Sequence, residues 1–250
     1  MEKSAKPTND ESDTLGNRGV PAPAAELFSV SKIYGTFAAL RNVSATFEAG
    51  SCTVIVGENG AGKSTLLRVL AGLITPTRGT AAVFSEPPHL QRRRMAYMSH
   101  STMLYDELTA MENLSYFAAL HRQGGCACVG NPETALRAVG LDPHLNRPVG
   151  QYSQGMRQRA SLARVLQTDP ELLLLDEPFS NLDVASAHHM VELLADFRTW
   201  PVSSANGVPG CRTILLTTHQ AHLAEPIADV ILTMRNGQIV STIARRDIAR

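Results

Sequence analysis

Apolar residues in this chain follow two spacings, one typical of buried strands and one typical of helices. Residues 172–175 are four consecutive leucines, as expected of a strand buried on both faces of a parallel sheet. In 63–73, by contrast, Leu66, Leu67 and Leu70 recur at a helical interval and form one apolar face. The two spacings alternate along the chain, which predicts an α/β fold.

The same reading, extended over the whole chain, places strands and helices in turn. The expected strands are 26–30, 51–56, 95–98, 172–175, 213–217 and 230–233, and the expected helices are 63–73, 110–121, 132–139, 155–167 and 184–197. Such alternation predicts a doubly wound sheet. Residues of approximately 100–165 read as mostly helical, so they predict a helical subdomain inserted into the core.

The N-terminal segment has a different composition. Residues 1–24 are polar, contain Gly and Pro and have no period, which predicts a disordered tail before a folded domain at 25–250. This end also lacks the apolar core of a signal peptide. Residues 199–211 are rich in Gly, Pro and Ser and read as a connector.

Net charge, the lengths of the apolar stretches and the cysteines limit which classes of protein this chain can belong to. The formal net charge is +0, so bulk attraction to nucleic acid or anionic lipid is not expected. No apolar stretch approaches the ~20 residues that span a bilayer, so we expect a cytoplasmic protein that meets the membrane through a partner. The four cysteines, Cys52, Cys126, Cys128 and Cys211, are expected to stay reduced. Cys126 and Cys128 could bind a soft metal or haem, but glycines around them favour a loop.

A glycine-rich turn lies between the strand predicted at 51–56 and the helix predicted at 63–73. Glycine accepts positive φ and has no Cβ, so backbone N–H groups can turn inward around phosphate, where the helix N-terminus adds positive charge. Lys63 is placed to reach the β- and γ-phosphates, and the Ser64 hydroxyl to bind Mg²⁺. The predicted nucleotide-binding residues are Gly57, Glu58, Asn59, Gly60, Ala61, Gly62, Lys63 and Ser64.

Two adjacent carboxylates, Asp176 and Glu177, follow the leucine run directly. Neighbouring side chains of a strand point to opposite sides, so the two acids can take separate tasks. We expect Asp176 to hold Mg²⁺, directly or through water, and Glu177 to orient the attacking water and accept its proton. The pair predicts hydrolysis of the bound nucleotide.

Two further polar sites lie at the ends of predicted elements. Ser153 and Gly155 open a helix, where a hydroxyl and an unobstructed backbone N–H can bind a γ-phosphate. His219 follows the strand predicted at 213–217, and a histidine can donate a hydrogen bond and exchange protons near neutral pH.

In their order, these motifs resemble the nucleotide-binding domain of ATP-binding-cassette (ABC) transporters, over roughly residues 26–245. The resemblance implies a P-loop NTPase (RecA-like) fold with an inserted helical subdomain. It also implies transport-coupled hydrolysis of ATP with Mg²⁺, a head-to-tail homodimer, and separate transmembrane permease subunits. The motifs are the phosphate loop, Tyr152-Ser153-Gln154-Gly155-Met156, Asp176-Glu177-Pro178, Ser180-Asn181-Leu182-Asp183 and His219.

The resemblance assigns further roles residue by residue. Tyr34 would stack on adenine, a contact that hardly discriminates among bases. Thr65 would bind an α-phosphate oxygen, Asp183 would contact the partner subunit, and His219 would touch the γ-phosphate. The signature residues, which would bind the ATP of the other subunit, are Ser153, Gln154, Gly155 and Met156.

One position departs from the family. His100 stands where the family carries a glutamine whose amide oxygen reaches Mg²⁺. Mg²⁺ prefers oxygen ligands, so His100 is a poor direct ligand. We expect it to act through water or by hydrogen bonding.

The stretch Tyr97-Met98-Ser99-His100, with Thr217-Thr218-His219-Gln220, resembles the ATPase subunit of the bacterial haem exporter used in cytochrome c maturation. This resemblance implies haem export or release of a haem-loaded chaperone, with the subunit peripheral on the cytoplasmic face of the inner membrane and without direct haem binding. Another export substrate remains an alternative, since Tyr152–Met156 also resembles drug-exporter ATPases.

Two other classes of protein are less favoured. An ABC domain that binds ATP without turnover would not need Glu177 and His219. A soluble ABC protein of translation or DNA repair usually has two cassettes or a long coiled-coil insertion. The run Arg92-Arg93-Arg94 fits either a solvated loop or a contact with a partner or lipid.

Overall fold

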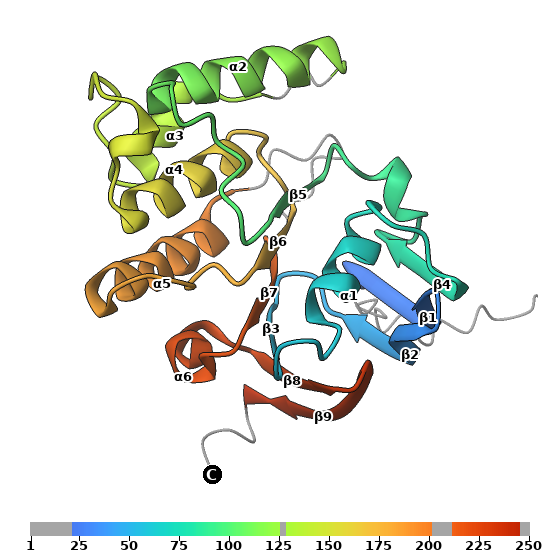
Figure 1. Cartoon of the computed structure of the whole chain (residues 1–250). Coiled ribbons are helices and arrows are strands. Elements are labelled where there is room, and N and C mark those ends of the chain that lie inside the picture. The colour runs from blue at the N-terminus through green and yellow to red at the C-terminus, as the bar shows by residue number, and fades with distance from the viewer. Residues whose placement is uncertain (1–21, 126–128, 202–211, 246–250) are drawn as a thin grey trace, which may run out of the picture.

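A six-stranded, mostly parallel sheet forms the centre of the molecule (Figure 1). The computed structural model describes residues 22–125, 129–201 and 212–245. The strand order is β5-β6-β7-β3-β8-β9, and β9 alone runs antiparallel to its neighbour. These strands are β3 (Cys52–Val56), β5 (Met95–Met98), β6 (Leu172–Asp176), β7 (Thr213–Thr218), β8 (Val230–Arg235) and β9 (Gln238–Ala244).

The two faces of this sheet belong to different hydrophobic cores. In β6, Leu173 and Leu175 pack into the core shared with most of the helices, whereas Leu172 and Leu174 face α1 (Lys63–Leu70). All four leucines are fully buried, as expected of a strand covered on both faces. The continuous apolar run at 172–175 therefore indicates a central strand of the sheet.

Among the described residues, three α-helices lie between β5 and β6, and they gather on one side of the molecule (Figure 1). They are α2 (Ala110–Gln123), α3 (Pro132–Ala138) and α4 (Gln154–Leu166). Side chains cap their N-termini, since Thr109, Asn131 and Ser153 each accept a backbone hydrogen bond from the first turn. The next helix, α5 (Val184–Thr199), follows β6 and is capped by Asp183. The helices α2, α3 and α4 thus occupy about half of residues 100–165, the stretch predicted to be mostly helical.

A second sheet was missed by the sequence reading, which predicted a strand only at 26–30. β1 (Ala25–Tyr34), β2 (Phe37–Phe47) and β4 (Arg78–Val83) form an antiparallel sheet in the order β2-β1-β4. The register of β1 shifts at several points, so its inward side chains do not alternate regularly. Without that alternation, no strand period is visible in the sequence.

Shorter elements complete the part of the chain that the structure describes, and α1 is shorter than predicted. The short elements are the 3-10 helices Pro88–Leu90, Val149–Gln151 and Glu225–Ile227, and α6 (Ala221–Ala224). α1 ends at Leu70 and not at the predicted residue 73. Gly72 takes a left-handed φ of 65°, which ends the helix, and an added Cβ would meet the His89 backbone at 2.9 Å.

The predictions for the N-terminal tail and for three of the cysteines concern residues that lie mostly outside the described ranges. Of the tail expected at 1–24, residues 1–21 lie outside the described residues, while Ala24 is buried and donates to the Phe47 carbonyl at 2.8 Å. The proposed roles of Cys126, Cys128 and Cys211 also lie outside them. Within the described ranges, no helix is long and apolar enough to cross a bilayer.

Candidate active site

The turn between β3 and α1 has the backbone that a phosphate-binding loop requires. Gly57, Gly60 and Gly62 have φ values of 155°, 82° and 101°, which L side chains rarely adopt. A Cβ at Gly57 would lie 2.4 Å from the Met234 carbonyl oxygen, and one at Gly62 would lie 2.5 Å from that of Ala39. Both glycines are therefore required by the close approach of other backbone, as well as by their own conformation.

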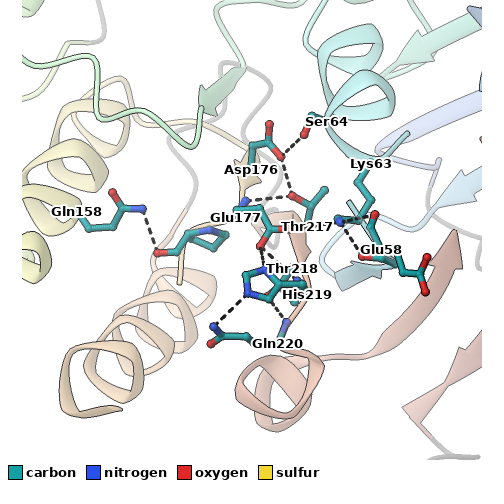
Figure 2. Close-up of polar contacts among 12 residues, drawn as sticks. Glu58, Lys63, Ser64, Gln158, Asp176, Glu177, Thr217, Thr218, His219 and Gln220 are labelled. Carbon is teal, nitrogen blue, oxygen red and sulfur yellow. Dashed lines mark hydrogen bonds and ion pairs between the residues drawn. The ribbon is translucent and has the colours of Figure 1, made fainter. Parts of the chain in front are cut away.

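Lys63, the first residue of α1, is buried beneath this turn. Its Nζ donates to the carbonyl oxygens of Gly57 at 2.7 Å and Glu58 at 3.2 Å, and lies 3.4 Å from Oε1 of Glu177. Figure 2 shows the ammonium group between the loop and the end of β6. One cation thus connects the glycine turn to the acidic pair.

Asp176 ends β6 and is almost fully buried, with its charge held by hydroxyl groups. Oδ1 accepts from Ser64 Oγ and from Thr217 Oγ1, both at 2.8 Å, and Oδ2 accepts from Tyr97 Oη at 3.1 Å. A carboxylate beside a hydroxyl is a set of hard oxygen donors, which suits Mg²⁺ when phosphate oxygens and water complete the shell. In the ranges that the structure describes, no cluster of three or more His, Cys, Asp or Glu competes as a metal site.

Glu177 lies beyond the strand and not on it, which corrects the sequence argument for this residue. Its φ is 54°, so the chain turns in the left-handed region directly after Asp176. The two carboxylates are separated by this turn and not by the alternation of a strand. The Glu177 N–H donates to Thr217 Oγ1 at 3.0 Å, which fixes the turn against β7.

His219 follows β7 and faces the same carboxylate (Figure 2). Its Nδ1 lies 3.0 Å from Glu177 Oε2, and its backbone N–H donates to that oxygen at 3.3 Å. The imidazole is half exposed, whereas Glu177 is largely buried. Glu177 therefore lies between two cationic or proton-exchanging groups, Lys63 and His219.

A cavity of about 200 Å³ brings together the predicted nucleotide residues from Asn59 to Thr65, but Tyr34, Gly57 and Glu58 do not line it. Phe37 lines it but was missed by the sequence analysis, although it pairs across the β1–β2 hairpin with Tyr34. Both rings are exposed, Tyr34 to 47% and Phe37 to 58%, so both are available for stacking. The other lining residues are Ala39, Asn59, Gly60, Ala61, Gly62, Lys63, Ser64, Thr65 and Glu177.

Comparison with known proteins decides the family. The family model described as "ABC transporter" matches residues 40–180, and one described as "AAA domain, putative AbiEii toxin, Type IV TA system" matches residues 141–225. The chain is 32% identical to the ABC transporter ATP-binding protein NatA of Bacillus subtilis over 207 residues, covering 81% of this chain and 80% of NatA. The chain belongs to the ABC transporter family.

Other comparisons agree with this ABC cassette assignment. The Nod factor export ATP-binding protein I of Rhizobium meliloti is 34% identical, covering 91% of this chain and 66% of that protein. A solved ATP-binding subunit of an ABC transporter is 28% identical with a TM-score of 0.71, covering 91% of this chain and 92% of that one. The cassette therefore has the predicted P-loop NTPase fold, and it is an ATPase that serves an ABC transporter.

The residues predicted as the signature lie away from the phosphate loop of the same chain. Ser153 caps α4 by accepting from the Met156 N–H at 3.3 Å. α4 packs into the core on one face of the large sheet, and α1 packs into the core on the other. Gly155 is required locally, since an added Cβ would meet Ser186 Oγ at 2.5 Å. Gln154 is exposed, and the Met156 sulfur accepts from Arg147 at 3.2 Å.

Asp183 and His100 occupy exposed positions. Asp183 caps α5 by accepting from the Ser186 N–H at 2.7 Å, and this backbone hydrogen bond lowers the pKa of its carboxyl. His100 lies two residues beyond β5 and makes no hydrogen bond within the described residues. Among the described residues, His100 therefore makes no hydrogen bond with the Asp176 carboxylate.

Three residues that hold this site together were not predicted. Thr217 and Tyr97 bind Asp176, and the buried Gln158 donates from α4 to the Pro178 carbonyl oxygen at 3.2 Å. Thr217 and Tyr97 lie in strands next to β6, so the parallel order of β5, β6 and β7 would have identified them. Gln158 depends on how α4 packs, which no local pattern encodes.

Proposed function

We propose that this chain is the ATP-hydrolysing subunit of an ABC exporter and that Glu177 is the general base. The observation that carries the proposal is the position of the Glu177 carboxylate. It lines the same cavity as the phosphate loop, 3.4 Å from Lys63 and 3.0 Å from His219. A carboxylate there can orient a water molecule toward the γ-phosphate and accept its proton.

The other residues take roles that follow from their chemistry. Lys63 and the loop N–H groups bind the β- and γ-phosphates, and Thr65 binds the α-phosphate. His219 holds the attacking water and the γ-phosphate near Glu177. Tyr34, joined by Phe37, forms the adenine platform.

Ser64 and Asp176 are the residues that would hold Mg²⁺. The bound ion would neutralise phosphate charge and help to position the γ-phosphate. His100 acts as a hydrogen-bonding or water-mediated neighbour and not as a ligand. Its exposed side chain can contact water, which is consistent with that role.

The complete site is proposed to need two chains. Because α4 and α1 lie on opposite faces of the sheet, the signature residues are poorly placed to reach ATP on their own chain. A head-to-tail homodimer would present Ser153 and Gly155 to the γ-phosphate of the other protomer. Asp183, which is exposed at the start of α5, would then contact the partner.

The proposed cargo is haem, or the haem-chaperone complex released during cytochrome c maturation. The motifs around His100 and His219 support this proposal by resemblance, and no haem contact is assigned to this chain. The cassette would work on the cytoplasmic face of the inner membrane with separate permease subunits.

Loss of the gene tests the cargo directly. A strain in which the gene is deleted, or is replaced by the Glu177→Gln variant, should lack haem covalently bound to c-type cytochromes, measured by haem staining. Its b-type cytochromes should remain. The wild-type gene should restore the c-type signal. Normal c-type cytochromes in the deletion strain would exclude haem export.

Export of another substrate is the second candidate. It is favoured by the Nod factor export relative, whose printed name gives a cargo other than haem. In that case the deletion strain would keep its c-type cytochromes and would instead accumulate or become sensitive to the exported compound.

A further inference from the structure

A pocket away from the nucleotide cavity lies where α3, the C-terminal end of α4 and the residue after α5 meet. Its volume is about 670 Å³, within the range of roughly 300–1,000 Å³ that is usual for small-molecule sites. Of the described residues, none lines both this pocket and the nucleotide cavity. The apolar part of its wall consists of Val129, Ala135, Ala138, Leu166 and Trp200.

Gln167, which caps the C-terminus of α4, lines this pocket and has an unsatisfied side chain. It is 3% exposed, and its Nε2 and Oε1 atoms are buried without a hydrogen-bond partner among the described residues. Its backbone is satisfied, since its N–H donates to the Ala163 carbonyl oxygen at 3.0 Å and its carbonyl oxygen accepts from the Gly130 N–H at 2.7 Å. A buried amide without partners is costly, so the pocket favours a ligand that supplies both a donor and an acceptor.

The charge at this pocket is compensated within the protein. Asp169 is the one charged residue among the described residues that line it, and its carboxylate accepts a hydrogen bond from the buried guanidinium of Arg212. Arg212 also donates to the Trp200 carbonyl oxygen at 3.2 Å, so one side chain positions both the acid and the tryptophan. An ionic ligand would lose its hydration without gaining a counter-charge, so a neutral ligand is favoured.

Trp200 gives the pocket an aromatic wall. Its ring is partly buried and packs edge to face against Phe197, with the ring centres 5.7 Å apart and an interplanar angle of 71°. An aromatic or apolar group in the pocket therefore meets a ring that is already held in place, and its burial is favourable.

The two polar atoms of a glutamine amide lie side by side on one planar group. A primary carboxamide or a ring amide presents an acceptor and a donor along one edge, so it can pair with both atoms at once. A trans peptide bond points its N–H and its carbonyl oxygen in opposite directions, so it pairs with only one of them. Water can satisfy the amide but leaves the apolar wall hydrated. A small carboxamide therefore fits this pocket better than a peptide or water does.

We propose that this pocket binds a neutral small molecule that has an aromatic or apolar body and a carboxamide edge. The carboxamide pairs with the side-chain amide of Gln167, and the body packs against Trp200 and Leu166. The proposal goes beyond the hydrolysis of ATP and does not depend on it, because the lining residues of the two cavities are separate.

Benzamide is the probe that tests this site, because it combines a phenyl ring with a primary carboxamide and has no charge. Trp200 is the only tryptophan in the chain, so the NMR spectrum of the isotopically labelled full chain contains a single indole N–H signal, which reports on the pocket. Benzamide should shift this signal saturably at millimolar concentration. Acetophenone, which keeps the ring and the carbonyl oxygen but has no N–H group, should require a roughly tenfold higher concentration.

Two outcomes of this titration would overturn the proposal. The first is the absence of a saturable shift up to the solubility limit of benzamide, which is also the result expected if another part of the chain fills the pocket. The second is an equal affinity for benzamide and acetophenone, which would show that the amide of Gln167 selects nothing.

Gln167→Leu tests the amide pairing. Leucine removes the two unsatisfied atoms and keeps a similar volume, so the variant should have a melting temperature no lower than that of the wild type. Its affinity for benzamide should fall roughly tenfold, while its affinity for toluene, which has no polar group, should rise. Wild-type affinity of Gln167→Leu for benzamide would contradict the pairing.

Ala138→Phe tests the location. The larger ring fills the pocket and should abolish the saturable shift, whereas Ala119→Phe, at an exposed position of α2 outside the pocket, is the matched control and should retain it. Basal Mg·ATPase activity of both variants should equal that of the wild type, since neither alanine lines the nucleotide cavity. Persistence of the shift in Ala138→Phe would place benzamide elsewhere and overturn the proposal, while leaving the proposed role of Glu177 untouched.

Discussion

At the scale of single residues, the buried charge of Asp176 depends on three hydroxyl groups. Ser64, Thr217 and Tyr97 all donate to it, and each comes from a different element of the large sheet or from α1. Burial raises the pKa of Tyr97, so its hydroxyl stays protonated and can donate. The carboxylate is thereby oriented beside the phosphate loop.

Removing the Tyr97 hydroxyl should weaken metal binding without unfolding the protein. A hydrogen bond to a charged group contributes ~1.5–3 kcal/mol, so Tyr97→Phe should raise the Mg²⁺ concentration needed for half-maximal ATPase activity roughly tenfold. Tyr116→Phe, on the surface of α2, is the control. If the Mg²⁺ requirement of Tyr97→Phe matched the wild type, Tyr97 would have no positioning role.

Cys52 gives a second prediction at this scale. Burial raises the pKa of its thiol to about 12, so at pH 8 almost none of it is thiolate. Peptide-resolved alkylation with iodoacetamide should leave Cys52 unmodified in the native protein and modify it in urea. Rapid native labelling of Cys52 would contradict its burial in β3.

At the scale of elements, the sequence predicted those helices, strands and turns whose signals lie within a short stretch of residues. The phosphate loop, β6 and the capped helices were predictable because glycine spacing, a leucine run and helical periodicity are local signals. The small antiparallel sheet was not, since irregular register in β1 removes the period. The turn at Glu177 was not predictable either, because its left-handed backbone depends on hydrogen bonds to β7.

Substitution of Gly79 tests the close approach of β4 to β1 in the small sheet. It has a φ of 79°, and an added Cβ would lie 2.4 Å from both the Phe28 and Ser29 carbonyl oxygens. Gly79→Ala should therefore lower the free energy of unfolding by about 1–3 kcal/mol, measured by urea denaturation. Gly35→Ala is a control because Gly35 also has a left-handed φ, of 57°, but has open space around it. Equal losses in the two variants would contradict the close approach of β4 to β1.

At the scale of the whole molecule, the proposed homodimer would divide each ATP site between two chains. The phosphate loop with Glu177 lies by α1, and the signature residues lie at the start of α4, across the sheet. Gln158 connects the two halves within a chain by binding the Pro178 carbonyl oxygen next to Glu177. Within the proposed dimer, this hydrogen bond would connect the acidic end of β6 to α4.

The fate of ATP on the Glu177→Gln variant tests the central claim most directly. Gln keeps the shape of the side chain but cannot accept the proton, so Mg·ATP should bind and remain uncleaved. We expect a species of twice the 27.0 kDa chain mass by light scattering, with one intact ATP per chain. Lys63→Ala, which should not bind ATP, is the control. Turnover of ATP by Glu177→Gln at the wild-type rate would contradict the account.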